Sequence, residues 1–336
     1  MIVNFLADYG MFLAKLGTVA VLILVVIFVV FFLYMRARSG TEDHLEIKNL
    51  NQKYEQMRLM LKSAMLPKKE FKKALKELKA KRKKEEKTGQ QEDAHRRIFV
   101  LDFNGDYRAT EVTSLREEIS AVLTVANKED EVFIRLESGG GAVHGYGLGA
   151  SQLKRITDRG IRLTVAVDKV AASGGYMMAC VASHIIAAPF AILGSIGVLA
   201  QLPNFNRFLK KHDIDFEQLT AGKYKRTLTM FGENTDADRE KVRQELEDIH
   251  ALFREFVQSN RAAVDIEKAA TGEHWYGKQA LEIGLVDELR TSDDYLAGHA
   301  TTADIYEVCY VRKRPLLEKL LHPATALFQR DSLGEN

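Results

Sequence analysis

The pattern of hydrophobic and polar residues divides the chain into distinct parts. Residues 16–35 form an uncharged, mostly apolar run of twenty residues. At about 1.5 Å per helical residue this run matches the roughly 30 Å hydrocarbon core of a bilayer. A charged stretch follows, and from residue 97 short apolar runs alternate with amphipathic ones. We therefore predict an N-terminal segment (1–15), a transmembrane helix (16–35), a charged stalk or linker (36–96), a main domain (97–310) and a helical tail (311–336).

The alternative interpretation of residues 16–35 is a cleaved signal peptide. Its apolar region would be about 7 to 15 residues long and would precede a site of small residues. Here the run is longer and Tyr34-Met35-Arg36-Ala37-Arg38 closes it, which favours a retained anchor. Under the positive-inside rule the basic residues after the helix would leave the main domain in the cytoplasm, but this criterion is weak for a first helix. The side of the membrane therefore stays open.

Within the main domain, β-rich runs alternate with helical patterns. Strands are predicted at 98–103, 132–136, 163–167 and 185–188, and helices at 113–125 and 143–159. This alternation is typical of βαβ units and predicts an α/β fold. A longer helix is predicted after Thr235, whose hydroxyl can cap it. The uncharged run 185–200 contains Pro189 and two glycines and is too short to span a bilayer, which favours a buried strand-turn-strand.

Composition and charge narrow the function classes. The 48 basic and 46 acidic side chains nearly balance, so the overall charge does not predict a nucleic-acid partner. The basic run at 68–87 fits a solvated helix of the stalk, with attraction to anionic lipid headgroups as the alternative. Cys180 and Cys309 lie in apolar stretches and are predicted to be core thiols rather than a disulfide framework. No spaced metal-binding motif is present, and no metal or other cofactor is predicted.

Two glycine-rich loops carry the candidate chemistry. Glu137-Ser138-Gly139-Gly140-Gly141 follows a predicted strand, and glycines there leave backbone N–H groups free to approach a negatively charged atom. Ser173 precedes Gly174-Gly175 and an apolar helical run. A serine in this position is either a nucleophile beside unpaired N–H groups or a simple helix N-cap. We weigh both interpretations, and the first needs a general base.

The base is not an obvious histidine. No histidine lies between His184 and His212; His184 is expected to be structural, and His144 is a minor candidate for lining the cleft. A lysine can serve instead when burial or a neighbouring cation lowers its pKa.

Three motifs together resemble a known family. They are Ala172-Ser173-Gly174-Gly175-Tyr176, then Gly222-Lys223-Tyr224-Lys225, and Gly272-Glu273 followed by Ala280 and Gly284-Leu285-Val286-Asp287. They resemble the signal peptide peptidase A family of membrane serine peptidases, and the whole architecture resembles its SohB branch. The resemblance covers about residues 97–290 and includes the transmembrane start.

This resemblance implies a Ser-Lys dyad on a Clp protease/crotonase-like fold. By position Ser173 matches the nucleophile and Lys225 the general base, with Lys223 as the near rival, while Gly140, Gly141 and Gly174 would form the oxyanion hole. The family also implies a single-pass protein of the bacterial inner membrane, peptide substrates such as signal peptides or membrane-protein fragments, the lipid bilayer as a partner, and a homo-oligomer. Whether neighbouring subunits complete the dyad stays open.

The chain departs from the family at Gly139, where proline is usual, which puts the preorganisation of the hole in doubt. Among the competing functions, dinucleotide binding at Gly145-x-Gly147-x-x-Ala150 fails because the first glycine comes nine residues after the strand ends. A Walker loop fails because Tyr224 follows Gly222-Lys223. A crotonase-like enzyme would not need the serine and lysine pair, and a non-catalytic membrane scaffold remains the other alternative.

Overall fold

A computed structural model describes residues 2–38, 43–73, 75, 76, 80, 96–222 and 224–312. The chain divides into two compact units, one holding the N-terminal helix and the other running from Leu45 to Tyr310. Most of the basic run 68–87 and the predicted tail beyond residue 312 lie outside the described residues.

The first unit contains α1 (Ile2–Arg38), a helix of 37 residues. Its stretch Gly10–Phe32 is long and apolar enough to cross a membrane, and none of it is buried in the protein. Large apolar side chains along it are exposed, for example Leu22 at 68% and Phe28 at 66%. A helix that is apolar all round and uncovered by protein has the properties of a bilayer-spanning segment, as predicted for 16–35.

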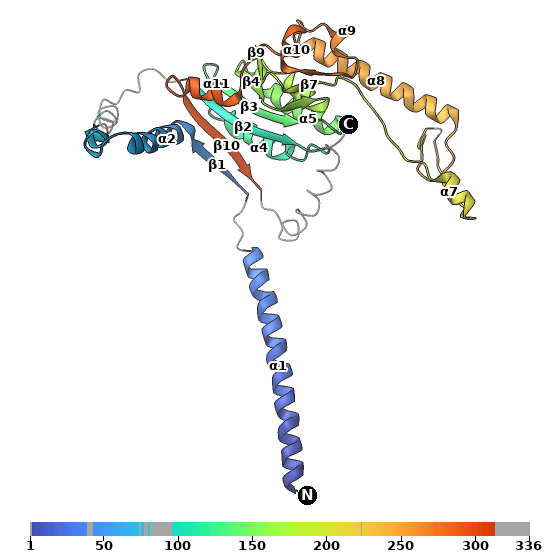
Figure 1. Cartoon of the computed structure of the whole chain (residues 1–336). Coiled ribbons are helices and arrows are strands. Elements are labelled where there is room, and N and C mark those ends of the chain that lie inside the picture. Colours follow the sequence, from blue (N-terminus) through green and yellow to red (C-terminus); the bar gives the residue numbers. More distant parts are fainter. Residues whose placement is uncertain are drawn as a thin grey trace. The chain divides into compact units, whose positions relative to one another are not determined.

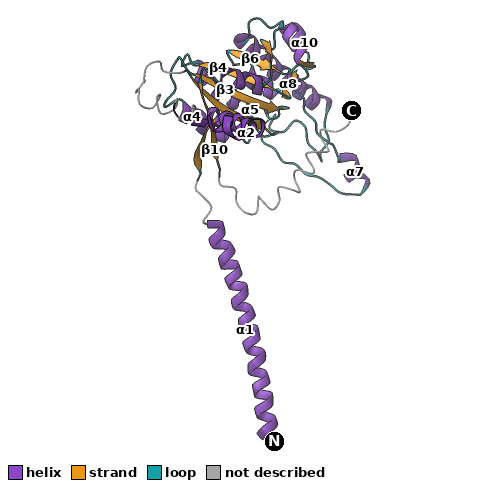
Figure 2. Cartoon of the chain, turned by 60° about the vertical axis from the view of Figure 1, so that its left-hand side comes forward, coloured by secondary structure: helices purple, strands orange, loops and turns teal. Residues whose placement is uncertain are grey.

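The second unit is an α/β domain (Figures 1 and 2). Its strands are β1 (His44–Asn49), β2 (Arg97–Gly105), β3 (Glu131–Ser138), β4 (Arg162–Val167), β5 (Val170–Ala172), β6 (His184–Ala187), β7 (Ile192–Gly194), β8 (His274–Tyr276), β9 (Glu288–Leu289) and β10 (Asp304–Val311). Its helices are α2 (Leu50–Met65), α4 (Val112–Val122), α5 (Val143–Thr157), α6 (Gly174–Ala179), α7 (Asn206–Lys211), α8 (Asp236–Asn260), α9 (Ile266–Ala269), α10 (Gly277–Glu282) and α11 (Ser292–His299). The predicted α/β fold with βαβ units is confirmed.

The strands are joined in the order β1-β10-β2-β3-β4-β6-β9. From β10 to β9 every neighbouring pair is parallel, with Phe103 opposite Leu136 between β2 and β3. β5 leaves this path: it pairs in parallel with the end of β3 and with β7, and β7 pairs antiparallel with β8. The ends of β3, β5 and β7 are thereby brought together, and the candidate site lies there.

Alternation along the central strands separates two cores. Phe99, Leu101 and Phe103 of β2 face a large cluster with α4, α5 and α8, whereas Ile98 and Val100 face a smaller cluster. The smaller cluster includes Leu50 of α2 and Tyr295 and Leu296 of α11. Since both faces of the sheet are covered, its strands are apolar on both sides, which is typical of parallel sheets.

The structure adds to the sheet a segment that we expected to lie in the stalk. β1 pairs with β10, and Leu50 at the start of α2 is only 3% exposed. The Asn51 side chain donates to the carbonyls of Ala300 and Ala303, at 2.8 Å each, and accepts from the Ile305 amide at 2.7 Å. Three hydrogen bonds across roughly 250 residues of sequence therefore fasten this segment to the domain.

The long helix α8 begins as predicted, because Thr235 caps it in a capping box with Asp238. Of the apolar side chains along this helix only Phe253 and Val257 are buried, and Leu252 is 65% exposed. The N-terminal part of α8 leads away from the sheet toward α7, so its apolar residues have no core to reach (Figure 1). The strand-turn-strand predicted at 185–200 is confirmed by β6 and β7.

The two cysteines differ from each other. Cys180 is buried as predicted, but Cys309 is exposed and the prediction for it is wrong. Val308 packs in the larger cluster, so Cys309 lies on the other side of β10 with Ile305, and the smaller cluster includes Ile305 but does not extend to Cys309.

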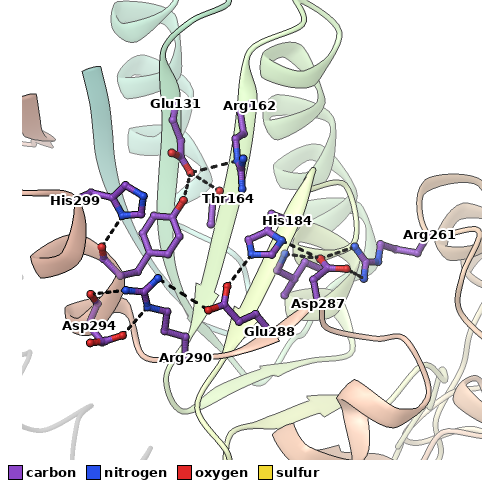
Figure 3. A network of polar contacts seen from close by, with 12 residues as sticks. Glu131, Arg162, Thr164, His184, Arg261, Asp287, Glu288, Arg290, Asp294 and His299 are labelled. Carbon is purple, nitrogen blue, oxygen red and sulfur yellow. Dashed lines mark hydrogen bonds and ion pairs between the residues drawn. The ribbon is translucent and has the colours of Figure 1, made fainter. Parts of the chain in front are cut away.

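A polar network on the sheet includes His184 and indicates its role (Figure 3). His184 Nε2 lies 3.3 Å from Glu288, and its Nδ1 lies 3.7 Å from Asp287. Asp287 in turn accepts two hydrogen bonds from Arg261, at 2.8 and 2.9 Å, and one from the Ile185 amide. His184 therefore joins β6 to the segment that leads into β9, the structural role predicted for it.

Candidate active site

Ser173 lies on a sharp turn between a strand and a helix. β5 ends at Ala172 and α6 begins at Gly174, so Ser173 alone makes the turn. It does so at φ 51° and ψ −117°, a region that residues with a Cβ rarely adopt. The Ser173 amide donates to the Gly194 carbonyl of β7 at 2.7 Å, which holds the strained turn in place. Strain of this kind persists only where surrounding structure enforces it, and it is common at active sites.

The Ser173 side chain does not cap α6. The helix has no hydrogen bond from the side chain of its N-cap residue. A serine that served only as an N-cap would accept a hydrogen bond from an amide two or three residues later. The geometry thus excludes the interpretation of this serine as a simple helix N-cap. Its side chain is half-buried, and the interpretation as a nucleophile remains.

The glycine loop after β3 meets this turn. A Cβ placed on Gly140 would lie 2.7 Å from the Gly174 nitrogen and 2.8 Å from Ser173 Cβ. Gly140 also has φ +89°, which glycine adopts without strain. The structure therefore brings together Gly140, Ser173 and Gly174, which are far apart in sequence, and the closeness requires glycine at 140.

The three amides predicted for the oxyanion hole differ in their hydrogen bonding. The Gly140 N–H donates to Ser138 Oγ at 3.1 Å. Among the described residues no hydrogen bond engages the amides of Gly141 or Gly174. Two of the three amides predicted for the oxyanion hole are thus unpaired in this structure, and the third is held by a serine hydroxyl.

A buried tyrosine supports both loops, and sequence reasoning did not identify it. Tyr146 of α5 is fully buried, and its hydroxyl lies 2.6 Å from Ser138 Oγ and donates to the Asp106 carbonyl, also at 2.6 Å. A side chain on Gly174 would overlap the Tyr146 ring. Burial raises the pKa of Tyr146, so its hydroxyl stays protonated and able to donate. The signal in the sequence is slight: a tyrosine between Gly145 and Gly147 where the helix starts.

Gly139 has a different environment from its neighbours. Its position is exposed, and a Cβ placed on it would meet nothing within 4 Å. The structure therefore shows no steric need for glycine at 139, in contrast to 140.

Lys225 lies in a separate part of the domain. Residues 198–234, which we call the arm, leave β7, pass through α7 and return at the cap of α8. Figure 1 shows α7 beyond the N-terminal end of α8, apart from the sheet. The Lys225 side chain is exposed, and no hydrogen bond or ion pair among the described residues joins it to Ser173. Its rival Lys223 lies outside the described residues.

The arm exposes many large apolar side chains. They are Leu199 (75%), Leu202 (43%), Phe205 (44%), Phe208 (59%), Ile214 (50%), Phe216 (42%), Leu219 (96%), Tyr224 (56%), Met230 (37%) and Phe231 (40%). Scattered apolar residues are normal on a surface, but a concentration of this size is typical of an interaction surface.

His250 holds the residues that lead into the arm to the domain, and sequence reasoning did not identify it. From α8 its Nε2 lies 3.1 Å from the Ile196 carbonyl and 3.0 Å from the Ala270 carbonyl. The Ser195 amide donates to the Glu273 carbonyl at 2.8 Å in the same region. The start of the arm is therefore fixed to the domain just beyond Gly194, which holds Ser173. His144 is exposed on α5, and no described contact relates it to Ser173.

Comparisons with known proteins identify the family of this chain. The model of the peptidase family S49 N-terminal region matches residues 4–153, and the model of peptidase family S49 matches residues 155–305. A probable protease SohB of Haemophilus influenzae is 48% identical over 95% of this chain and 93% of its own length. The probable protease SohB of Buchnera aphidicola subsp. Schlechtendalia chinensis is 48% identical over 87% of this chain and 99% of its own.

A solved structure of the 1510-N membrane-bound stomatin-specific protease is a remote match. It covers 68% of this chain and 99% of its own, at 14% identity and a TM-score of 0.44, too distant for a comparison of site residues. The two family models and the identity to the two SohB proteases over nearly their whole length show that this chain belongs to peptidase family S49, as a SohB-like peptidase.

Proposed function

We propose that the protein is a membrane-anchored serine endopeptidase in which Ser173 is the nucleophile and Lys225 the general base. The observation that carries this proposal is the Ser173 turn: a strained serine that caps no helix and lies against the glycine loop at Gly140. Nucleophilic serines of other hydrolases occupy comparable sharp turns from strand to helix, which expose the hydroxyl.

The reaction is acyl transfer. Lys225 as a neutral amine takes the proton of Ser173 Oγ, and the oxygen attacks the carbonyl carbon of a peptide bond. The amides of Gly174 and Gly141, with Gly140 once it releases Ser138 Oγ, hydrogen-bond the oxyanion. The carbon–nitrogen bond then breaks as the lysine ammonium returns the proton to the leaving amine. Water activated by the same amine releases the acyl group from Ser173.

We further propose that Lys225 reaches Ser173 of a neighbouring subunit in a homo-oligomer. The exposed position of Lys225 and the exposed apolar side chains of the arm support this proposal. A lysine is a base near neutral pH only when its ammonium is disfavoured, and packing of the arm against another subunit would remove water from Lys225. The apolar residues of the arm would supply the dry surroundings.

The membrane relationship and the substrates follow from α1 and the family. We propose that α1 anchors the enzyme as a single pass in a bacterial inner membrane, with the bilayer as its partner. We propose substrates that are peptides such as signal peptides or fragments of membrane proteins, with small or aliphatic side chains at the cleaved bond. Residues 97–310 would form the peptidase domain, with the β1–α2 segment docked on it.

Labelling with a fluorophosphonate probe tests the nucleophile. The intact protein in detergent should react at Ser173, and peptide mapping by mass spectrometry should place the adduct there. The Ser173→Ala variant should take up no probe and cleave no peptide. If the intact protein remains unlabelled, or the Ser173→Ala variant labels equally, the chain is a non-catalytic scaffold instead.

A further inference from the structure

The helix α2 is covered along only part of its apolar face. Leu50, Tyr54, Met57, Leu61 and Met65 recur every three or four residues and so lie on one face. Leu50 and Tyr54 pack with the smaller core cluster of the domain. The remainder of the face continues beyond that cluster and is exposed.

We call this exposed part the α2 apolar face. It consists of Met57 (52%), Leu61 (65%) and Met65 (78%) of this series, with Met60 (73%) beside them, three residues after Met57. Four long apolar side chains side by side on one surface helix would be costly to leave in water, because each exposes area that a partner could cover. The described residues leave them uncovered.

Basic residues adjoin the α2 apolar face. Lys62 lies in the last turn of α2, and the helical turn after Pro67 adds Lys68, Lys69, Lys72 and Lys73, all of which are exposed. In sequence, residues 68–87 contain eleven Lys and Arg against four Glu. An apolar stripe with lysines beside it is the pattern of helices that lie in the interface of a membrane.

We propose that the α2 apolar face and the following lysines bind the surface of a bilayer that contains anionic lipids. The apolar side chains would enter the boundary between headgroups and acyl chains, and the lysines would meet lipid phosphates. Charge complementarity supplies this occupant, because the lysines that follow the apolar side chains match anionic headgroups, and a parallel pairing of two copies of the face would bring the two sets of lysines together.

The connection between α1 and α2 is short enough to allow this contact with the bilayer. Only residues 39–49 separate the end of α1 from the start of α2. Eleven residues span at most about 40 Å when fully extended, so a bilayer crossed by α1 is within reach of α2. The proposal therefore rests on the proposed anchoring through α1, and it adds a second, electrostatic contact between the peptidase domain and the lipid.

The test is lipid quenching of a fluorophore on the face. A Cys309→Ser background leaves only the buried Cys180, and Met60→Cys is labelled with bimane in the full chain. The matched control is Phe190→Cys, at a position that is 84% exposed in the turn before β7. Both proteins are reconstituted into phosphatidylcholine vesicles with or without about 30% phosphatidylglycerol, each containing nitroxide-labelled lipid.

We expect the label at 60 to be quenched at least roughly threefold more than the label at 190 in vesicles with phosphatidylglycerol, and the difference to shrink in about 0.5 M NaCl. Replacing Lys68, Lys69, Lys72 and Lys73 by Gln should remove the effect of phosphatidylglycerol. Equal quenching at 60 and 190 overturns the proposal. So does protection of the label at 60 that depends on protein concentration and not on lipid, which would assign the face to a second copy.

A separate measurement distinguishes anchoring by α1 from membrane contact of the α2 apolar face. Resistance of the vesicle-bound protein to extraction by alkaline carbonate reports α1. Protein that resists extraction but shows no quenching at residue 60 retains the anchor and loses the α2 contact. Protein that is quenched but extracted keeps the α2 contact and contradicts the anchor.

Discussion

The turn at Ser173 and the arm that carries Lys225 are opposite in their packing. Around Ser173, the glycine loop and the serine turn are held in place by close packing. The contributors are a buried tyrosine, a serine hydroxyl and two glycines without room for a side chain. In its described residues the arm has one short helix, of six residues, and its large apolar side chains are exposed. The contrast supports the proposal that one chain preorganises the nucleophile, whereas the base depends on contacts with a neighbouring subunit.

The largest expected effect comes from the arm. Lys225→Ala should lower peptide cleavage by about 10³-fold, because the serine loses its proton acceptor. Its melting temperature should match that of the parent, since Lys225 is exposed. Lys223→Ala is the control and should retain activity. The reverse outcome, with Lys223→Ala inactive and Lys225→Ala active, would move the base to residue 223. Steady-state hydrolysis of a fluorogenic peptide measures both variants.

On the nucleophile side, neighbouring glycines should differ sharply. Gly140→Ala should lower kcat by about 10²-fold, because its Cβ would push against Gly174 and Ser173 at the proposed oxyanion hole. Gly139→Ala has open space and should stay within roughly twofold of the parent. Equal activity of the two variants would contradict the close contact of the glycine loop with the Ser173 turn.

A smaller effect is expected from the tyrosine that supports both loops. Tyr146→Phe removes the hydroxyl shared by Ser138 Oγ and the Asp106 carbonyl and should destabilise the domain by about 1–3 kcal/mol. Tyr107→Phe, at a position that is 74% exposed, should change the stability by less than about 0.5 kcal/mol. Urea denaturation of both variants gives the comparison. An unchanged midpoint for Tyr146→Phe would show that the network does not hold the loops.

The last comparison concerns pH and the packed half of the domain. Burial raises the pKa of Glu118 on α4 from 4.5 to about 7, with the carboxylates of Glu111 and Asp102 adding to the shift and a hydrogen bond from the Tyr310 amide opposing it. The folded state thus holds this proton more tightly than the unfolded state. Its contribution to stability is full below pH 4.5 and is lost as pH rises through about 7.

Glu118→Gln should therefore match the parent near pH 4.5 and be more stable by up to about 3 kcal/mol at pH 8, since a neutral amide does not ionise. Glu117→Gln, at a partly exposed carboxylate on the same helix, is the matched control. Thermal unfolding at several pH values measures both. An identical pH dependence for the parent and Glu118→Gln would show that this carboxyl is ionised in the folded domain.

The sequence predicted the elements whose signals are local. The β-rich runs located β2, β3, β4 and β6, and Thr235 predicted the start of α8. The Ser173 motif indicated a serine at the start of a helix, but its strained backbone and the absence of a cap bond depend on strands that pair far along the chain. Long-range contacts also explain what was missed: the hydroxyl of Tyr146, the hydrogen bonds of His250 and the docking of β1 and α2.

The central claim is that a nucleophile preorganised in one chain meets a base from another. Co-assembly of Ser173→Ala subunits with Lys225→Ala subunits tests it, because each variant lacks one member of the dyad. In an equal mixture about a quarter of the contacts between neighbours unite an intact serine with an intact lysine. Peptide hydrolysis should recover to roughly that fraction of the parent activity, while each variant alone stays inactive. A mixture as inactive as its components would contradict a dyad shared between subunits.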